Sequence, residues 1–345
     1  MEYCLMHWLG KVLGYVPLLG LNVNMGRSFK SYLLEENMPK RIFDLKAGMD
    51  EESLGIVDRC LLRICCDPEF YGSRKRNEQV FVRPRDYMDD EELRYVRDFL
   101  KKLPTLKKQF PMLSFEHSPE AAYSHNGLIS LPQRGLDYLK GKDFIDGGAY
   151  IGDSAITFRS YQPRKIWSFD ISSVHQKIYE KTMRRNGFTA EQYEFVIAGL
   201  YDTTREGKAT GNFGLDCSLQ NAESDVMESM SLTTLDDFRA KNQLNVGFLK
   251  LDIEGSEPQA IQGARETIQK DRPVLSISIY HNPESFFEIK PFLESLGIDY
   301  AYHILPLAPP CIPWLPLTHK GWWRIGACSF GETCLFAYPR ELGEK

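Results

Sequence analysis

The sequence predicts an α/β protein built on a doubly wound, mostly parallel sheet of seven strands, with a mainly helical region before it. From about residue 120, short apolar runs alternate with stretches of helical periodicity, as in sheets whose parallel strands are joined by helices. The runs are residues 143–148, 165–170, 193–198, 246–252, 274–280, 300–304 and 333–338. Earlier in the chain, Leu54, Val57, Leu61 and Ile64 recur at helical spacing behind an acidic helix start at 50–53. We therefore expect two domains, 1–118 and 119–345.

Between the apolar runs, four stretches have the apolar spacing or the boundary residues of helices. They are residues 154–161, a stretch that ends at 186–187, residues 256–270, and a stretch with one apolar face that ends at 297. Sheets of this class bind their ligands at the carboxyl ends of the strands. We therefore expect the functional residues at that edge.

Composition and charge exclude several classes of protein. Apolar residues make up 43% of the 345, which is enough for a core and excludes general disorder. The 42 Lys and Arg against 47 Asp and Glu give a net charge of −5, which disfavours nucleic acid as a partner. The eight cysteines contain no CxxC pair, which favours a reducing, cytoplasmic location.

The N-terminal segment has helical apolar spacing but is too short to cross a membrane. Its longest uncharged apolar stretch, 12–21, has ten residues and contains Pro17. We expect no transmembrane segment and no signal peptide. A helix there either packs on the body of the protein or makes a weak contact with a membrane surface.

A glycine-rich turn follows the first predicted strand and opens the next helix. It reads Asp-Gly-Gly-Ala-Tyr-Ile-Gly-Asp at 146–153, and glycine allows a tight turn and a close approach of a ligand to the backbone. The spacing differs from the dinucleotide pattern G-x-G-x-x-G. Asp170 ends the next strand, where a carboxylate can accept hydrogen bonds from ribose hydroxyls. The alternative is that Asp170 bonds the amides of Ser172 or Ser173 at the start of the following helix.

Two further carboxylates and a histidine are expected at the same edge. Asp252 and Glu254 follow the fourth strand and share one side if the strand stays extended. Glu254 is alternatively a backbone acceptor. His281 ends the fifth strand, where an imidazole can remove a proton from a hydroxyl, although Asn282-Pro283 beside it is also ordinary for a helix start. Residues 256–259 predict a capping box and give Glu257 a structural role at the helix start.

These blocks resemble the FkbM family of S-adenosylmethionine-dependent methyltransferases over about residues 123–338. The matching segments are DFIDGGAYIGDSAITF (143–158), WSFDIS (167–172), TTLDDF (233–238), FLKLDIEGSEPQAIQGA (248–264), PVLSISIYH (273–281) and GETCLFAY (331–338). The resemblance implies the Rossmann-like fold of class I methyltransferases. Family members usually have Glu-Pro where this chain has Asp170-Ile171, which shortens the carboxylate by one methylene.

The resemblance also implies a cofactor site. Asp146, Gly148 and Gly152 would hold the methionine part, Asp170 the ribose, and the region of Ala198 and Gly199 the adenine. The full set of expected cofactor residues is Asp146, Gly147, Gly148, Ala149, Tyr150, Gly152, Asp153, Asp170, Ile171, Ala198 and Gly199.

The function implied is O-methylation of a hydroxyl on a sugar, a glycan or a secondary metabolite, with N-methylation left open. The catalytic residues would be Asp252, Glu254 and His281: Asp252 or His281 as the base, or a divalent cation held by Asp252 and Glu254. A different class of function is an inactive cofactor-binding partner in an assembly cluster. A nucleotide-sugar oxidoreductase is disfavoured because the chain lacks G-x-G-x-x-G. The acceptor and the oligomeric state do not follow from the sequence.

Two segments have features of substrate-side loops. Three glycines in 207–214 predict a mobile loop over the site or a surface linker. The proline- and tryptophan-rich stretch 306–323 predicts an aromatic wall or a packed crossover loop.

Overall fold

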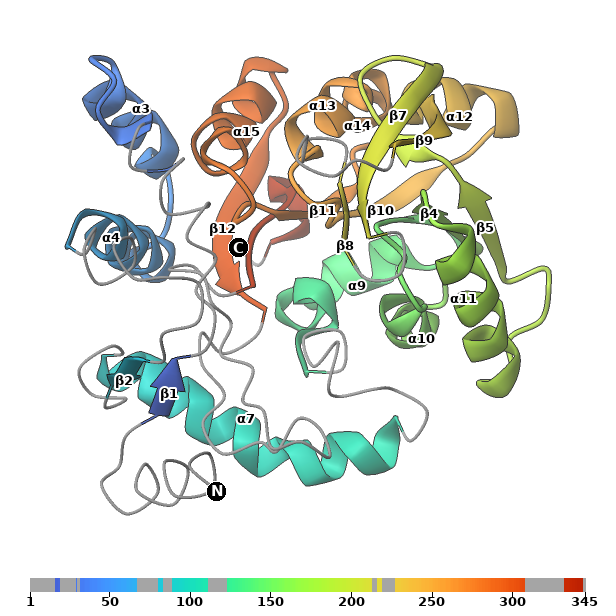
Figure 1. Ribbon diagram of the computed structural model, residues 1–345, viewed down its shortest axis with the longest axis horizontal. Coiled ribbons are helices and arrows are strands. Elements are labelled where there is room, and N and C mark those ends of the chain that lie inside the picture. Colours follow the sequence, from blue (N-terminus) through green and yellow to red (C-terminus); the bar gives the residue numbers. More distant parts are fainter. Residues whose placement is uncertain are drawn as a thin grey trace.

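The computed structural model describes residues 16–18, 29, 32–66, 80–82, 89–110, 123–212, 216–218, 227–307 and 332–343. Within them, seven strands form one sheet in the order β12-β13-β11-β10-β3-β4-β5 (Figure 1). All neighbouring pairs from β11 to β5 are parallel, and β13 is antiparallel to both of its neighbours. The predicted fold class is confirmed. The strands are β3 (Asp143–Gly147), β4 (Lys165–Asp170), β5 (Tyr193–Ile197), β10 (Val246–Leu251), β11 (Val274–Ser278), β12 (Tyr300–Pro306) and β13 (Thr333–Pro339).

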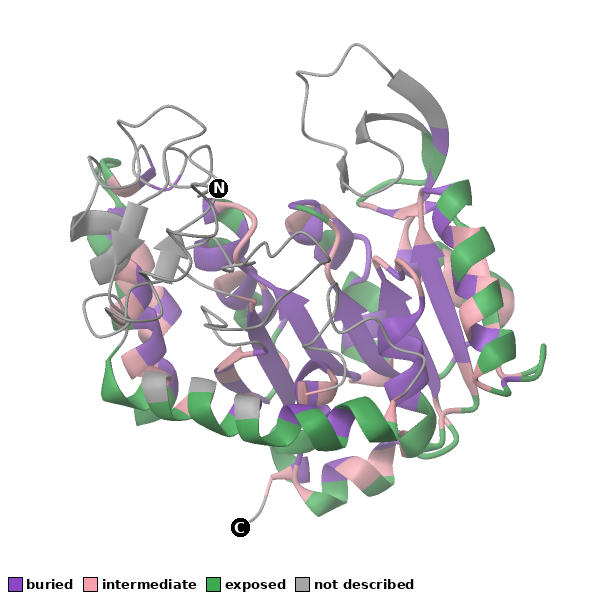
Figure 2. Cartoon of the chain, turned by 60° about the horizontal axis from the view of Figure 1, so that its bottom comes forward, coloured by how far each residue is buried: buried purple, intermediate pink, exposed green. Residues whose placement is uncertain are grey.

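Successive residues of the central strands face opposite sides of the sheet, and each side is a separate core. Leu249 of β10 lies beside Ile145 of β3 in one buried cluster. Phe248, one residue earlier, lies beside Phe144 and Val274 in the other. These strands are buried along their whole length and coloured accordingly in Figure 2. Burial on both faces explains why their sequences are continuous apolar runs.

Helices cover both faces of the sheet, as a doubly wound fold requires. Side chains of α13 (Glu257–Gln262), α14 (Arg265–Asp271) and α15 (Pro283–Ser295) belong to the first core, and those of α9 (Gln133–Leu139), α10 (Asp153–Phe158) and α11 (Ser173–Arg185) to the second. The two sets lie on opposite sides of the strands (Figure 1). Further short elements are α12 (Leu235–Asn242) and the 3₁₀ helices η1 (His125–Ser130), η2 (Arg159–Tyr161) and η3 (Arg340–Leu342).

The predicted helix 256–270 is two helices, α13 and α14. Gly263 lies between them, and a Cβ atom on it would be 2.0 Å from the carbonyl oxygen of Tyr201. The backbone at Tyr201 therefore approaches the chain at the point where the helix is interrupted. The predicted capping box is wrong: Ser256 is the N-cap residue of α13, but its side chain makes no capping hydrogen bond.

A second sheet has no counterpart in the sequence prediction. It contains β6 (Gly199–Leu200), β7 (Arg205–Asn212), β8 (Asp216–Ser218) and β9 (Met227–Thr233), in the order β6-β9-β7-β8. The predicted loop 207–214 is largely strand β7, which pairs with β9 from Arg205 to Thr210. The loop prediction was wrong because backbone pairing needs no side chain, so the glycines did not prevent a strand.

The described N-terminal residues are mainly helical, as predicted. They include α3 (Met38–Lys46), α4 (Glu51–Cys66) and α7 (Asp90–Gln109), together with an unpredicted pair of strands, β1 (Val16–Leu18) and β2 (Val80–Val82). Asp50 accepts a hydrogen bond from the Ser53 amide at the start of α4, which confirms the predicted helix start. None of the helices in the described ranges has both the length and the apolar character needed to cross a bilayer.

This region is attached to the sheet domain by hydrogen bonds. The Ser53 hydroxyl accepts from the Ile304 amide at 2.9 Å, Lys290 Nζ donates to the Asp44 carbonyl at 3.1 Å, and the Tyr95 hydroxyl donates to the Pro306 carbonyl at 2.8 Å. The division at residue 118 stays a prediction. Most of the N-terminal apolar segment and of the 306–323 stretch lies outside the described residues.

The aromatic core under β10 gives a test of the fold. The Phe248 ring lies 5.3 Å from that of Phe144 and 5.2 Å from that of Phe158, and its side chain is fully buried. Phe248→Ala should lower the free energy of unfolding by about 3–5 kcal/mol. Phe43→Ala, on a side chain that is 72% exposed, should change it by less than about 0.5 kcal/mol. Urea unfolding measures both, and equal losses would contradict the placement of this core.

Candidate functional site

Four adjacent parallel strands bring the predicted functional segments to one edge of the sheet. β11, β10, β3 and β4 are neighbours, so their carboxyl ends lie side by side (Figure 1). The segments that follow them begin at residues 279, 252, 148 and 171. The glycine turn, Asp170, Asp252 and His281 therefore lie along one edge of the sheet, as the sequence predicted.

The glycines of the turn after β3 are required by the protein's own packing. Gly148 has φ +77°, and a Cβ atom on it would lie 1.8 Å from the backbone oxygen of Asp252. Gly152 has φ +87°, and its Cβ would lie 2.6 Å from Cε of Met183. The amides of Gly148 and Ala149 both donate to the Phe169 carbonyl. The turn is thus fixed against β4, β10 and α11 by contacts within the chain.

Asp146 of β3 is a fully buried carboxylate that faces Lys250 of β10. Lys250 Nζ lies 3.3 Å from Asp146 Oδ1 and donates to the Gly148 carbonyl at 2.8 Å. Neither carboxylate oxygen accepts a hydrogen bond from the described residues. Burial raises the pKa of Asp146 to about 6, although the charge of Lys250 acts in the opposite direction. The site therefore contains a buried carboxylate with acceptor capacity.

Asp170, the last residue of β4, connects the glycine turn to the start of α11. Its Oδ1 accepts from the Ser172 amide at 2.8 Å, and its Oδ2 accepts from the Tyr150 amide at 3.0 Å. Nδ1 of His175 lies 3.0 and 3.1 Å from the two oxygens. The alternative prediction, a hydrogen bond to the Ser172 amide, is confirmed. Because a carboxylate has about four acceptor positions, capacity remains for another donor.

The other predicted cofactor residues belong to segments before and after Asp170 in the chain. Gly147 ends β3, Ala149 is buried in the second core, and Asp153 begins α10. Ala198 precedes β6, which starts at Gly199 and pairs with β9. On the same side, Ile171 and Tyr201 pack against a small apolar cluster of Met230 and Leu232 from β9. This cluster was not predicted from the sequence, because the prediction contains no strand at β9.

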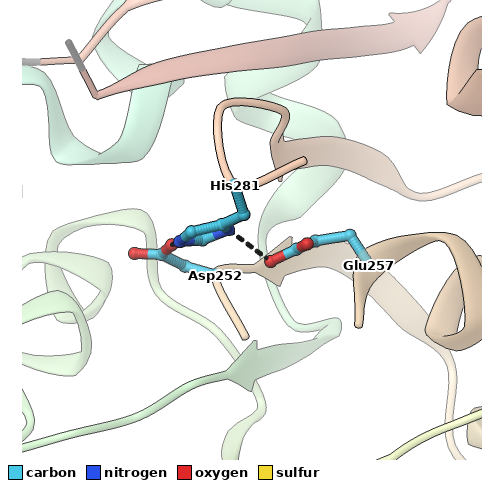
Figure 3. A group of neighbouring side chains, drawn as sticks. All are labelled: Asp252, Glu257 and His281. Atoms are coloured by element: carbon cyan, nitrogen blue, oxygen red, sulfur yellow. Dashed lines mark hydrogen bonds and ion pairs between the residues drawn. The ribbon is translucent and has the colours of Figure 1, made fainter. Parts of the chain in front are cut away.

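The second part of the site is a group that we call the His281 cluster: Asp252, Glu254, Glu257 and His281. Nδ1 of His281 is 2.9 Å from Oε1 of Glu257, and Nε2 is 3.6 Å from both Asp252 Oδ1 and Glu254 Oε2. Figure 3 shows the imidazole ring between the carboxylates of Asp252 and Glu257. Strand β10 ends at Leu251, and Glu254 has φ +55°, so a tight turn rather than an extended strand brings the carboxylates of Asp252 and Glu254 to His281.

The charges of the cluster change the pKa values of its members. Burial alone would lower the pKa of His281, but the three carboxylates, Glu257 foremost, raise it to about 10. Partial burial of Glu254, together with the negative charges of Asp252 and Glu257, raises its pKa against the effect of His281. Burial also acts to raise the pKa of Asp252, but Lys250 and His281 outweigh it and hold the pKa below its ordinary value. At neutral pH the imidazole of His281 is therefore positively charged and the carboxylate of Asp252 is negatively charged.

Glu257 is the residue whose place in the site sequence analysis missed. The predicted structural role at the start of α13 is present, because its fully buried carboxylate accepts from the Ile253 and Gly255 amides. The same oxygen also lies against His281, and the other accepts from the Ser285 hydroxyl. The one feature of the sequence that indicated this role of Glu257 is that it lies only a few residues after Asp252 and Glu254. Asn282 caps α15 through the Ser285 amide, so the predicted helix start is also confirmed.

Comparison with known proteins finds one domain family and several solved structures. The methyltransferase FkbM domain matches residues 146–300. No curated protein matches the chain. The crystal structure of methyltransferase FkbM from Methylobacillus flagellatus KT is 18% identical with a TM-score of 0.43, and the alignment covers 79% of this chain and 65% of that one. This chain thus spans about two thirds of that protein's length.

Two other solved structures are more distant. An O-methyltransferase from Bacillus cereus in complex with SAH is 9% identical with a TM-score of 0.35, covering 73% of this chain and 92% of that one. An rRNA methylase from Streptococcus thermophilus is 9% identical with a TM-score of 0.33, covering 60% and 92%.

The contact between the glycine turn and Asp252 can be tested with two matched glycines. Gly148 and Gly141 have φ of +77° and +71°, but a Cβ atom on Gly141 would have nothing within 4 Å. Gly141→Ala should cost about 1 kcal/mol of unfolding free energy from its backbone conformation. Gly148→Ala should cost about 1–3 kcal/mol more, because the new methyl displaces the Asp252 backbone. Chemical denaturation measures the difference, and equal effects would show that the turn is not pressed against residue 252.

Proposed function

We propose, on the premise that residues 146–300 belong to the methyltransferase FkbM family, that the chain methylates a hydroxyl oxygen with S-adenosylmethionine. The acceptor we propose is a sugar, a glycan or a secondary metabolite. The observation that supports this most directly is that the matched segment contains both halves of the site. One half is Asp146, the glycine turn and Asp170, and the other is the His281 cluster.

The first half suits the cofactor. The Asp146 carboxylate, buried and without a hydrogen bond from the described residues, can accept from the amino group of the methionine part. Asp170 has acceptor capacity for a ribose hydroxyl beside the hydrogen bonds that it already accepts. The apolar cluster that contains Ile171, Met230 and Leu232 is suited to pack beside a flat purine ring, and its Leu232 pairs with Gly199, the residue after Ala198.

The chemistry divides between the cofactor and the chain. Bound S-adenosylmethionine supplies an electrophilic methyl group: the acceptor oxygen forms a bond to that carbon as the carbon–sulfur bond breaks and its electron pair stays on sulfur. The chain's part is to align the two molecules and to take up the hydroxyl proton. The His281 cluster is the place for proton removal, because its carboxylates stand at the carboxyl edge beside the glycine turn. Asp252 is 31% exposed there and accepts a hydrogen bond from the Tyr280 hydroxyl at 3.2 Å.

The cofactor is tested by thermal unfolding with S-adenosylhomocysteine, S-adenosylmethionine and NAD in separate titrations. A ligand of the folded state at one hundred times its dissociation constant should stabilise by about 2.7 kcal/mol. We expect saturable shifts with the two sulfur nucleosides and none with NAD. A shift with NAD alone would replace methyl transfer by redox chemistry.

Binding of S-adenosylhomocysteine should weaken as the pH falls through the pKa of Asp146, about 6. Protonation removes the negative charge that accepts from the ligand's amino group. At pH 5 about one tenth of the chains keep that charge, so affinity should fall about tenfold from its value at pH 7.5. The charged or titratable groups around Asp146 are Lys250, Asp153, Asp170 and Tyr179.

Calorimetry at the two pH values measures the change, with Asp146→Asn as the control. That variant should bind more weakly at pH 7.5 and should lose most of the dependence on pH. An unchanged pH dependence in Asp146→Asn would assign the titration to another group.

Asp252→Asn separates turnover from cofactor binding. We expect it to reduce S-adenosylhomocysteine formation by about 10²–10⁴-fold, the usual contribution of a proton-transfer group. Its affinity for S-adenosylhomocysteine should stay within a few-fold of the parent's. The matched control is Asp98→Asn, which removes an exposed carboxylate from α7. A parent chain that binds the cofactor but forms no product with panels of sugars, glycans and hydroxylated metabolites would support the inactive-partner function instead.

A further inference from the structure

We propose that the His281 cluster is a binding site for one divalent cation, with Asp252, Glu254 and Nε2 of His281 as its protein ligands. Glu257 then acts as a positioning residue that holds the imidazole through Nδ1. The site itself is inferred from the contacts below and does not depend on methyl transfer. Only the binding of the methyl acceptor to this cation rests on the proposed function.

The two nitrogens of His281 have different surroundings. Nδ1 is 2.9 Å from Glu257 Oε1, and this carboxylate is fully buried and held by the Ile253 amide at 2.8 Å and the Ser285 hydroxyl at 3.3 Å. A neutral imidazole in this position carries its hydrogen on Nδ1, which leaves the lone pair of Nε2 for a cation. A carboxylate behind a histidine in this way is the usual arrangement in metal sites, where it fixes the tautomer and the ring orientation.

Nε2 is aimed at a space that is bounded by two carboxylates. It lies 3.6 Å from Asp252 Oδ1 and 3.6 Å from Glu254 Oε2, beyond the length of a hydrogen bond. The His281 side chain that carries this nitrogen is only 8% exposed. Ligands that are each about 2.1–2.2 Å from a cation and 3.6 Å apart subtend roughly 110–120° at the metal, close to the tetrahedral angle.

Glu254 is a better third ligand than Glu257. Among the described residues, those whose donor atoms all lie within 4.8 Å of one another are Asp252, Glu257 and His281, so the half-exposed Glu254 side chain must turn toward Asp252 to complete the proposed site. Both oxygens of Glu257, however, already accept hydrogen bonds from residues 253, 255, 281 and 285, and the side chain is fully buried. The Glu254 side chain is 53% exposed and Asp252 is 31% exposed, so a cation can enter from their side. Two carboxylates also balance the charge of a divalent ion.

One nitrogen and two carboxylate oxygens leave positions on the cation for other oxygen ligands. This donor set suits Mn²⁺, Mg²⁺, Fe²⁺ or Zn²⁺. If the chain methylates a hydroxyl, the open positions suit an acceptor with two adjacent oxygen atoms, such as a diol or a hydroxy acid. Coordination lowers the pKa of such a hydroxyl, and the proton that it loses passes to the second carboxylate oxygen of Asp252.

The test is binding of Mn²⁺ to the full chain, followed by electron paramagnetic resonance and calorimetry. We expect one Mn²⁺ per chain and competition by Zn²⁺. Glu254→Gln should weaken binding at least tenfold, and His281→Gln should abolish it. Glu284→Gln removes an equally charged, exposed side chain from the first turn of α15 and should bind as the parent does. The His281 side chain is buried, so its variant can fail to fold. The Glu254 side chain is half exposed, so Glu254→Gln should fold and still tests the site.

Absence of saturable Mn²⁺ binding would overturn the proposal and leave His281 as an imidazolium that balances its three carboxylates. Binding that Glu254→Gln leaves unchanged would overturn the ligand assignment. Thermal titration with S-adenosylhomocysteine on the same preparations separates this result from the proposed function. Mn²⁺ binding without nucleoside binding would refute the methyltransferase function alone, and nucleoside binding without Mn²⁺ would refute the cation site alone.

Discussion

The ion pair between Lys250 and Asp146 joins the two strands on which the whole site depends. The residues are paired in the parallel register of β10 and β3, both are buried, and Lys250 also donates to the Gly148 carbonyl. Gly148, two residues after Asp146, is also pressed against the backbone of Asp252. The turn after β3 and the turn after β10 therefore cannot move independently. This coupling holds the proposed cofactor half and the His281 cluster in a fixed relation.

Positive charge in the middle of this edge is what permits so many carboxylates. Burial acts to lower the pKa of Lys250, but Asp146 and Asp252 together raise it above the ordinary value, so the amine stays charged. His281 has the same relation to Asp252, Glu254 and Glu257. A cation bound at Nε2 would replace the proton of the imidazolium and leave the charge balance of the cluster favourable. Fixed charges of this kind need no rearrangement during a reaction, which is how enzyme sites gain much of their effect.

The central sheet was predictable from the sequence because burial on both faces gives continuous apolar runs. Every one of the seven runs became a strand, and the candidate residues at their ends are gathered at one edge. The second sheet was not predictable: β7 contains two glycines and few apolar residues, and its stability comes from pairing with β9. Likewise, the interruption at Gly263 depends on the approach of residue 201 from far along the chain. Contacts between distant segments leave little trace in local composition.

Glu257 illustrates why the roles of site residues are harder to predict than their positions. Its place in the first turn of a helix explained a carboxylate there without any partner elsewhere. In the folded chain, the turn formed by Glu254 at φ +55° brings Ile253 and Gly255 amides onto the same carboxylate that holds His281. One side chain thus closes the turn that positions Asp252 and Glu254 and also orients the imidazole between them. A residue that serves the local backbone can determine the chemistry of its neighbours, and for Glu257 the two roles depend on the same oxygen, Oε1.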